Sequence, residues 1–281
     1  MKLAFSTLGC PGWDLSTILA QAVKMGFDGV DFRGYRDELA VYKLPEFSSQ
    51  AEATARRFRD AGLEVACFSS SARAFNPTSK EQQASLDEVK EYAPLCAQFG
   101  ARYIRVFGGA IGERPHTQAI DSAVEGLTAM AEIASEHSAR LVIETHDDWV
   151  DSELLRRLFG EMKGDLVGVL WDVHHPYRLR GEPPALTWLN LGRWVEYTHW
   201  KDSLGDPSQP GSYTYTHFGE GDLPLAEFFE PVKNGHYQGY LTFEWEKRWH
   251  PDLAEPEEAF PRFIQVMRRF GVQPTPGFSH E

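Results

Sequence analysis

The chain has few cysteines, and they are far apart. Only three of its 281 residues are cysteine, at positions 10, 67 and 96, and no two of them form a CxxC pair. Isolated cysteines of this kind are typical of free thiols in a reducing compartment. The pattern excludes a disulfide framework and a thiolate metal site as the basis of the fold.

Long apolar runs are also missing. The segment from Met1 to Thr7 turns polar too soon for the core of a signal peptide, and no run elsewhere approaches the length of a membrane span. We therefore expect a cytoplasmic protein that does not bind a membrane.

Positive charge is scarce. The chain has 28 basic and 41 acidic residues, a formal net charge of −13, and we find no local basic patch. A surface of this sign repels a phosphate backbone, so we expect no nucleic-acid partner. The remaining composition, 42% hydrophobic and 25% charged, is that of an ordinary globular protein.

Short apolar runs of strand type recur along the chain and alternate with segments of helical spacing. The runs begin near residues 2, 29, 64, 103, 140, 167, 195 and 239, on average about 34 residues apart, which matches one βα unit. Between the first two, Asp14 opens a helical segment that Gly26 closes. Eight such units predict an α/β protein with a single (β/α)8 TIM barrel.

An open doubly wound sheet is the main alternative to a barrel. Such a sheet normally carries a glycine-rich phosphate turn after its first strand, and Gly9-Cys10-Pro11-Gly12 does not match G-x-G-x-x-G. We expect the barrel to span residues 1–272 and the tail, 273–281, to be loosely held. Residues 203–222, rich in Gly, Pro, Ser and Tyr, look like an insertion that could cover an active site.

Four consecutive predicted strands each carry a metal-ligating residue near the carboxyl end. These residues are Glu144, Asp172, His199 and Glu244. The carboxyl ends of barrel strands form one bowl, so the four side chains should converge there. Three buried acids and an imidazole are difficult to satisfy without a cation. The pattern therefore predicts one divalent metal.

The types of ligand indicate which metals would bind. Three carboxylates and one nitrogen favour Mn²⁺, with Mg²⁺, Co²⁺ or Zn²⁺ as alternatives. An octahedral ion held by four side chains has two positions left for the carbonyl and hydroxyl of a sugar. The metal would then acidify the neighbouring C–H and stabilise the resulting enediolate. Two glutamates could remove and return the proton.

At these residues the sequence resembles a known family, the xylose isomerase-like TIM-barrel superfamily in its sugar phosphate isomerase/epimerase branch. The motifs that carry the resemblance are Glu144-Thr145-His146, Trp171-Asp172-Val173-His174-His175, His199-Trp200-Lys201-Asp202, Gly219-Glu220-Gly221 and Phe243-Glu244-Trp245-Glu246. The match covers nearly the whole chain.

The resemblance implies roles for individual residues. Glu144, Asp172, His199 and Glu244 would bind the metal, and Glu144 and Glu244 would also be the catalytic acid/base pair. His175 would contact a substrate oxygen, with Lys201 nearby. His146 and Glu246 are further candidates for substrate binding. For these two the alternative is an ordinary ion pair, of His146 with Asp147 or Asp148 and of Glu246 with Lys247.

Two features differ from the ketohexose 3-epimerases of the superfamily. Those enzymes have an arginine beyond the strand-seven histidine, and here no arginine occurs between Arg193 and Arg248. They also have a second glutamate shortly after the strand-five one, and Val150 stands in that region here. These differences argue against a free ketohexose as substrate. No phosphate cradle is visible, and Arg33, Arg73, Lys247 and Arg248 are candidates for anion binding only because they lie near strand ends.

Three functions remain compatible with the sequence. The first is a metal-dependent isomerase or epimerase of a ketose, inosose or related polyol. The oligomeric state of such an enzyme is left open, and a homo-oligomer is compatible with the sequence. The second is a dehydratase of a keto-polyol, of inosose or dehydroshikimate type, on the same site. The third, more remote, is DNA repair of the endonuclease IV type. That enzyme needs histidines at the ends of strands three and four, where this chain has Phe68-Ser69-Ser70-Ser71 and Phe107-Gly108-Gly109.

Overall fold

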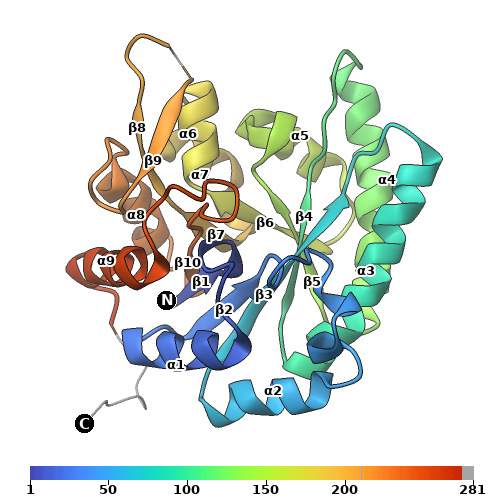
Figure 1. The fold of residues 1–281 in the computed structure, drawn as a ribbon. Helices are drawn as coiled ribbons and strands as arrows, with labels where there is room; N and C mark the ends of the chain where they lie inside the picture. Colours follow the sequence, from blue (N-terminus) through green and yellow to red (C-terminus); the bar gives the residue numbers. More distant parts are fainter. Residues whose placement is uncertain (210, 274–281) are drawn as a thin grey trace.

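Eight parallel strands pair edge to edge and close into a barrel (Figure 1). The structure is a computed structural model and describes residues 1–209 and 211–273. Around the barrel the strands follow the order β1-β10-β7-β6-β5-β4-β3-β2. Their bounds are β1 Lys2–Ser6, β2 Gly29–Phe32, β3 Glu64–Arg73, β4 Tyr103–Phe107, β5 Arg140–Glu144, β6 Val167–Asp172, β7 Val195–Trp200 and β10 Tyr240–Phe243. The predicted (β/α)8 barrel is confirmed.

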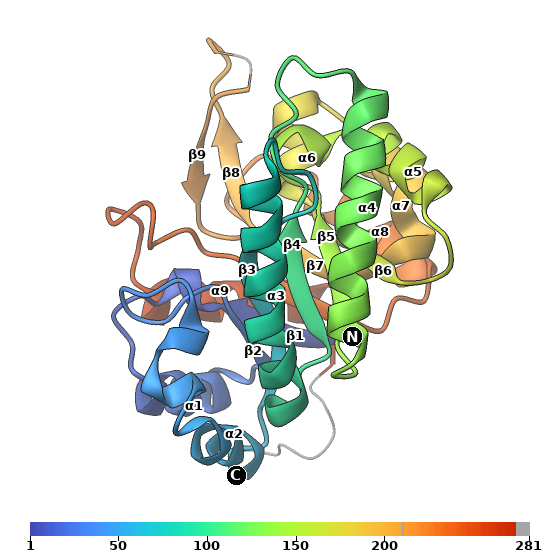
Figure 2. The same cartoon turned by 90° about the vertical axis from the view of Figure 1, so that its right-hand side faces the viewer.

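Helices connect the strands and cover the outside of the barrel, as Figures 1 and 2 show. They are α1 Leu15–Met25, α2 Ala51–Asp60, α3 Ser79–Phe99, α4 His116–Ser135, α5 Ser152–Glu161, α6 His174–Arg180, α7 Pro184–Leu191, α8 Leu225–Asn234 and α9 Pro256–Arg269. α1 has the boundaries that its sequence predicts. The Asp14 side chain accepts a hydrogen bond from the Thr17 backbone at 2.8 Å, and Gly26 ends the helix at φ 81°.

Two apolar cores hold the barrel. The large one lies between the sheet and the helices. The small one consists of Ala4, Ala66, Cys67, Tyr103, Val142, Leu170, Tyr197 and Tyr240. Because side chains alternate along a strand, the residues two positions beyond this small core also point into the barrel, closer to its carboxyl end.

A two-stranded antiparallel hairpin follows β7. It consists of β8, Asp202–Gly205, and β9, Tyr213–Thr216, and it projects beyond the barrel at the top of Figures 1 and 2. Its base is tied down by the Asp202 carboxylate, which accepts hydrogen bonds from the backbone of Gly219 and Gly221 at 2.9 and 3.0 Å. A Cβ on Gly221 would lie 2.0 Å from that carboxylate, so glycine is needed there. The insertion predicted at 203–222 is this hairpin and its return loop.

Of the predicted tail, residues 274–281 lie outside the described part of the chain. Within the described ranges, no helix is both long and apolar enough to cross a membrane.

Candidate functional site

The four predicted metal ligands come together at the carboxyl ends of neighbouring strands. Glu144 ends β5, Asp172 ends β6, His199 lies in β7, and Glu244 follows β10 directly. One ligand atom from each residue lies within 4.8 Å of the others, and all four side chains are buried. Octahedral ligands at about 2.1 Å from an ion are separated by roughly 3 to 4 Å. Only a small inward movement of the side chains is needed to bind one.

The barrel's alternation explains this convergence. Val142, Leu170 and Tyr197 belong to the core inside the barrel, and the metal-ligand candidates Glu144, Asp172 and His199 follow each of them by two residues. Asp172 is also the register partner of His199. The inward-facing side chains of these strands are therefore apolar in the core and ionisable two residues closer to the carboxyl ends.

The cluster fits a metal because three of its ligand atoms have no hydrogen-bond partner among the described residues. These atoms are Glu144 Oε2, Asp172 Oδ2 and His199 Nδ1, and all three are buried. Buried polar atoms are rarely left unpaired in native proteins. The chemistry of the set, three carboxylates and one imidazole, suits a divalent ion.

Opposite charges within the cluster shift the pKa values of its members. Burial opposes the charged form of His199, but Glu244, Asp31 and Glu144 outweigh it and raise the pKa of the imidazole well above its usual value. Burial likewise opposes ionisation of Glu144, but Arg105 and His199 hold its pKa at about 2. Metal binding at Nδ1 must displace a proton from His199.

Asp31, from β2, is a site residue that was not predicted. Its Oδ2 lies 3.0 Å from His199 Nε2, both side chains are fully buried, and its Oδ1 accepts a hydrogen bond from Ser69 Oγ at 2.7 Å. A carboxylate at Nε2 keeps the proton there and leaves Nδ1 for a metal. The sequence signal was an aspartate inside the apolar run Gly29–Phe32.

We expect Asp31→Ala to weaken metal binding by about 10- to 100-fold, the usual effect of losing the partner of a metal-ligating histidine. Titration against a chromophoric chelator measures this affinity. Ser69→Ala, which removes only the hydroxyl bonded to Asp31, should have a smaller effect. Unchanged affinity in a folded Asp31→Ala protein would contradict the orienting role.

Lys201 crosses the floor of the site. Its ammonium donates hydrogen bonds to Glu244 Oε2 at 2.5 Å and Glu246 Oε1 at 2.8 Å, and it lies 2.9 Å from Asp172 Oδ2. Burial opposes its charge, but these three carboxylates raise its pKa well above the usual value. The lysine therefore stays protonated, and Glu244 Oε1 remains the oxygen that faces His199, 3.2 Å from Nδ1. The alternative considered from the sequence was an ion pair between Glu246 and Lys247. Instead, Glu246 pairs with Lys201.

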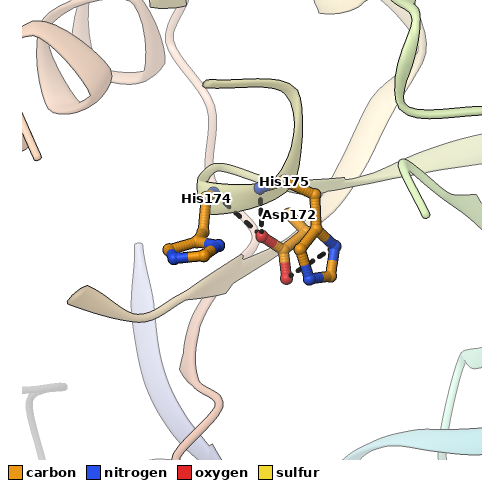
Figure 3. Close-up of side chains that lie close together, drawn as sticks. All are labelled: Asp172, His174 and His175. Carbon is orange, nitrogen blue, oxygen red and sulfur yellow. Dashed lines mark hydrogen bonds and ion pairs between the residues drawn. The ribbon is translucent and has the colours of Figure 1, made fainter. Parts of the chain in front are cut away.

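The Asp172 carboxylate also organises the loop that follows β6. Its Oδ1 accepts hydrogen bonds from the backbone nitrogens of His174 and His175 at 2.8 and 3.1 Å (Figure 3). The ring nitrogen Nδ1 of His175 lies 3.5 Å from Asp172 Oδ2 and 3.2 Å from the Thr145 carbonyl oxygen. Burial and Lys201 lower the pKa of His175 well below its usual value, so its imidazole is neutral.

A cavity of about 410 Å³ opens above the cluster. All four predicted substrate-binding residues line it: His146, His175, Lys201 and Glu246. The size is within the usual range for small-molecule sites. His146 lines the cavity and also pairs with Asp147, Nδ1 to Oδ1 at 2.9 Å, so the ion pair considered from the sequence does not remove it from the cavity.

Aromatic and arginine side chains form further walls of the cavity. Aromatic side chains line it from β4, from the hairpin and from the loop after β10: Phe107, Tyr213, Tyr215 and Trp249. Two arginines, Arg33 and Arg105, lie in the same wall, and neither was among the predicted site residues. Arg33 had been noted only for its position near a strand end.

The fold and the site together define a (β/α)8 barrel protein with a buried candidate metal centre at the carboxyl ends of its strands. The chain belongs to the Xylose isomerase-like TIM barrel family, whose sequence profile matches residues 19–270. The predicted family membership is confirmed.

Solved structures of low sequence identity share the fold over nearly their whole length. The IolI protein, with a bound zinc atom, has a TM-score of 0.81 at 19% identity, covering 96% of this chain and 99% of its own. The probable 3-DHS dehydratase AsbF from Bacillus anthracis has a TM-score of 0.76 at 18% identity, covering 95% and 99%. The 3-keto-D-glucoside 4-epimerase YcjR from E. coli has 0.72 at 15%, covering 96% and 99%. Comparison with curated proteins gives no match.

Proposed function

We propose that the protein is a divalent-metal-dependent isomerase or epimerase of a ketose, inosose or related polyol. The observation that carries the proposal is the pair of buried carboxylates, Glu144 and Glu244, next to one imidazole at the base of the cavity. Glu144 Oε1 and Glu244 Oε1 lie 3.4 and 3.2 Å from His199 Nδ1. The fold is also that of an epimerase, YcjR, although at 15% identity.

Glu144, Asp172, His199 and Glu244 would hold the metal. Mn²⁺ suits this mostly oxygen donor set, and the zinc in the IolI structure keeps Zn²⁺ as an alternative. A bound divalent ion would polarise a substrate carbonyl and acidify the neighbouring C–H.

The glutamates carry the proton transfers in this proposal. Glu144 and Glu244 belong to β5 and to the end of β10, two strands that are not neighbours in the barrel. A substrate between them would present a different face to each carboxylate. Burial opposes their ionisation, yet Arg105 beside Glu144, and His199 and Lys201 beside Glu244, lower both pKa values, so each begins as a base. The hydrogen-bonded chain from Glu246 through Lys201 to Glu244 supplies a route for the returning proton.

A dehydratase on the same site is the second candidate, and His146 is the observation that favours it. Loss of a hydroxyl needs a proton donor beside the leaving oxygen. Burial opposes the charged form of His146, but Asp147 and Glu144 raise its pKa above the usual value, which favours the protonated form that can donate. AsbF, a probable dehydratase, shares the fold. DNA repair is not favoured, because the net charge is −13 and the four-residue cluster contains a single histidine.

Solvent exchange tests the proposal directly. The protein is incubated with Mn²⁺ in D₂O and a panel of ketoses, inososes and their acids, and the products are analysed by mass spectrometry. We expect one compound class to take up deuterium at a carbon next to the carbonyl. Loss of water from that compound would instead establish the dehydratase. No exchange and no water loss across the panel, with the metal bound, would exclude both.

A further inference from the structure

Arg105 is fully buried in the cavity wall, with much of its hydrogen-bonding capacity unused. Its side chain is 1% exposed, and its Nε and Nη1 have no hydrogen-bond partner among the described residues. The nearest carboxylate oxygen is Glu144 Oε2, 3.4 Å from Nε and outside hydrogen-bond geometry. A guanidinium is always charged and seeks flat, two-oxygen partners. Burying one with unused donors is costly unless a ligand occupies them.

Arg33 lies next to Arg105 and, unlike it, has no carboxylate at ion-pair distance among the described residues. Its Nη1 donates a hydrogen bond to Ser71 Oγ at 3.0 Å. Within residues 1–209 and 211–273 Arg33 forms no ion pair, and the carboxylates that favour its charge, Glu88 and Glu144, act from a greater distance. Burial and the neighbouring Arg105 lower the pKa of Arg33 to about 10, which still leaves it charged at neutral pH.

The two guanidinium groups share one aromatic neighbour. Cζ of Arg105 lies 3.7 Å and Cζ of Arg33 5.6 Å from the centre of the Phe107 ring. All three side chains line the cavity above the candidate metal centre. Two like charges held together beside a site for small molecules are stabilised by an anion that bonds both.

We propose that Arg33 and Arg105 bind an anionic group of the substrate, so that the compound taken by the site is an acidic sugar or polyol and not a neutral one. This inference rests on the proposed function, because it names the substrate class of the same cavity. In this arrangement the four candidate metal ligands would lie at the reacting carbonyl end and the arginine pair at the charged end.

A carboxylate suits the pair better than a phosphate. Phosphate sites usually add free backbone N–H groups to their cations. In the loop after β4, three backbone N–H groups already donate to carboxylates of the chain. The N–H of Gly109 donates to Asp147, and those of Ile111 and Gly112 donate to Asp148. Side-chain forks alone match the planar, two-oxygen geometry of a carboxylate.

The test is calorimetric titration of the Mn²⁺-loaded full chain with three related probes. These are D-fructose, D-fructuronate, in which a carboxylate replaces the C6 hydroxymethyl group, and D-fructose 6-phosphate. We expect D-fructuronate to bind about tenfold or more tightly than D-fructose, the scale of a charge-assisted hydrogen bond. Arg33→Gln should remove that difference and leave metal content unchanged.

Two further variants make the test specific. Arg248→Gln removes the same charge from a residue that does not line the cavity, and it should keep the preference for the anion. Arg105→Lys keeps a positive charge beside Glu144 but loses the fork, and it should weaken D-fructuronate binding even if Arg33→Gln fails to fold.

Each outcome decides the question. A preference for D-fructose 6-phosphate that depends on Arg33 would support an anion site for phosphate. Equal or tighter binding of D-fructose, a preference that survives Arg33→Gln, or no binding of either anion at millimolar concentration would overturn the inference. None of these measurements needs turnover. A confirmed anion preference without deuterium exchange would therefore sink only the proposed reaction, and exchange on a neutral sugar would sink only the anion site.

Discussion

Replacing Glu144 or Glu244 by glutamine is expected to lower turnover by about a hundredfold or more, the usual scale for losing a positioned acid or base. Glutamine keeps the shape of the side chain and one oxygen that can face a metal, but it cannot accept the substrate proton. The measurement is the rate on the substrate identified by deuterium exchange. Metal content is determined for each variant, because both residues also belong to the candidate metal centre.

The two variants should differ in solvent exchange. The variant that lacks the proton-abstracting carboxylate should lose exchange of the substrate proton with solvent. The variant that lacks the proton-returning carboxylate should retain this exchange. Glu161→Gln, an exposed change outside the cavity, is a matched control and should keep full activity. If both glutamine variants turn over at wild-type rates with metal bound, the two-glutamate mechanism is wrong, and another group must remove the substrate proton.

Asp172→Asn is expected to abolish metal retention, with a loss of metal affinity of about a hundredfold or more. This loss exceeds the one expected for Asp31→Ala, because Asp31 contacts a candidate ligand and is not one itself. The asparagine carbonyl can still accept the backbone hydrogen bonds of His174 and His175, so the loop after β6 is preserved. Its amide nitrogen would replace Oδ2, the oxygen that faces the Lys201 ammonium at 2.9 Å, and would repel a cation. Asp172→Ala, which removes both functions, should lose the metal and also destabilise the fold.

Elemental analysis after dialysis measures this result, together with the metal-dependent rise in melting temperature, which should disappear. Asp202→Asn is the matched control. Asp202 is buried and accepts backbone hydrogen bonds, but it lies outside the four-residue cluster, so its variant should still bind one equivalent. Full metal occupancy in Asp172→Asn would show that the ion binds elsewhere.

Much of the architecture follows from patterns that depend only on neighbours along the chain. Seven of the eight predicted strand starts coincide with observed ones, and the eighth, near 239, lies one residue before β10. Alternation of apolar and polar residues, helix caps such as Asp14 and the regular spacing of strands are local properties. The convergence of Glu144, Asp172, His199 and Glu244 could be predicted as well, because closing any parallel barrel brings its strand ends together.

The sequence by itself determined the barrel, the positions of the four candidate ligands at the strand ends and the insertion after β7. Only the tertiary structure decided which other side chains contact these candidate ligands. Asp31 and Arg105 lie inside apolar runs and are separated from their partners His199 and Glu144 by 168 and 39 positions; nothing local indicates those contacts. Closing the barrel places β2 and β4 on the same inner face as β5 and β7. Burial then turns an ordinary aspartate and arginine into the partners of a candidate metal centre, because a charge in the interior must find its complement there.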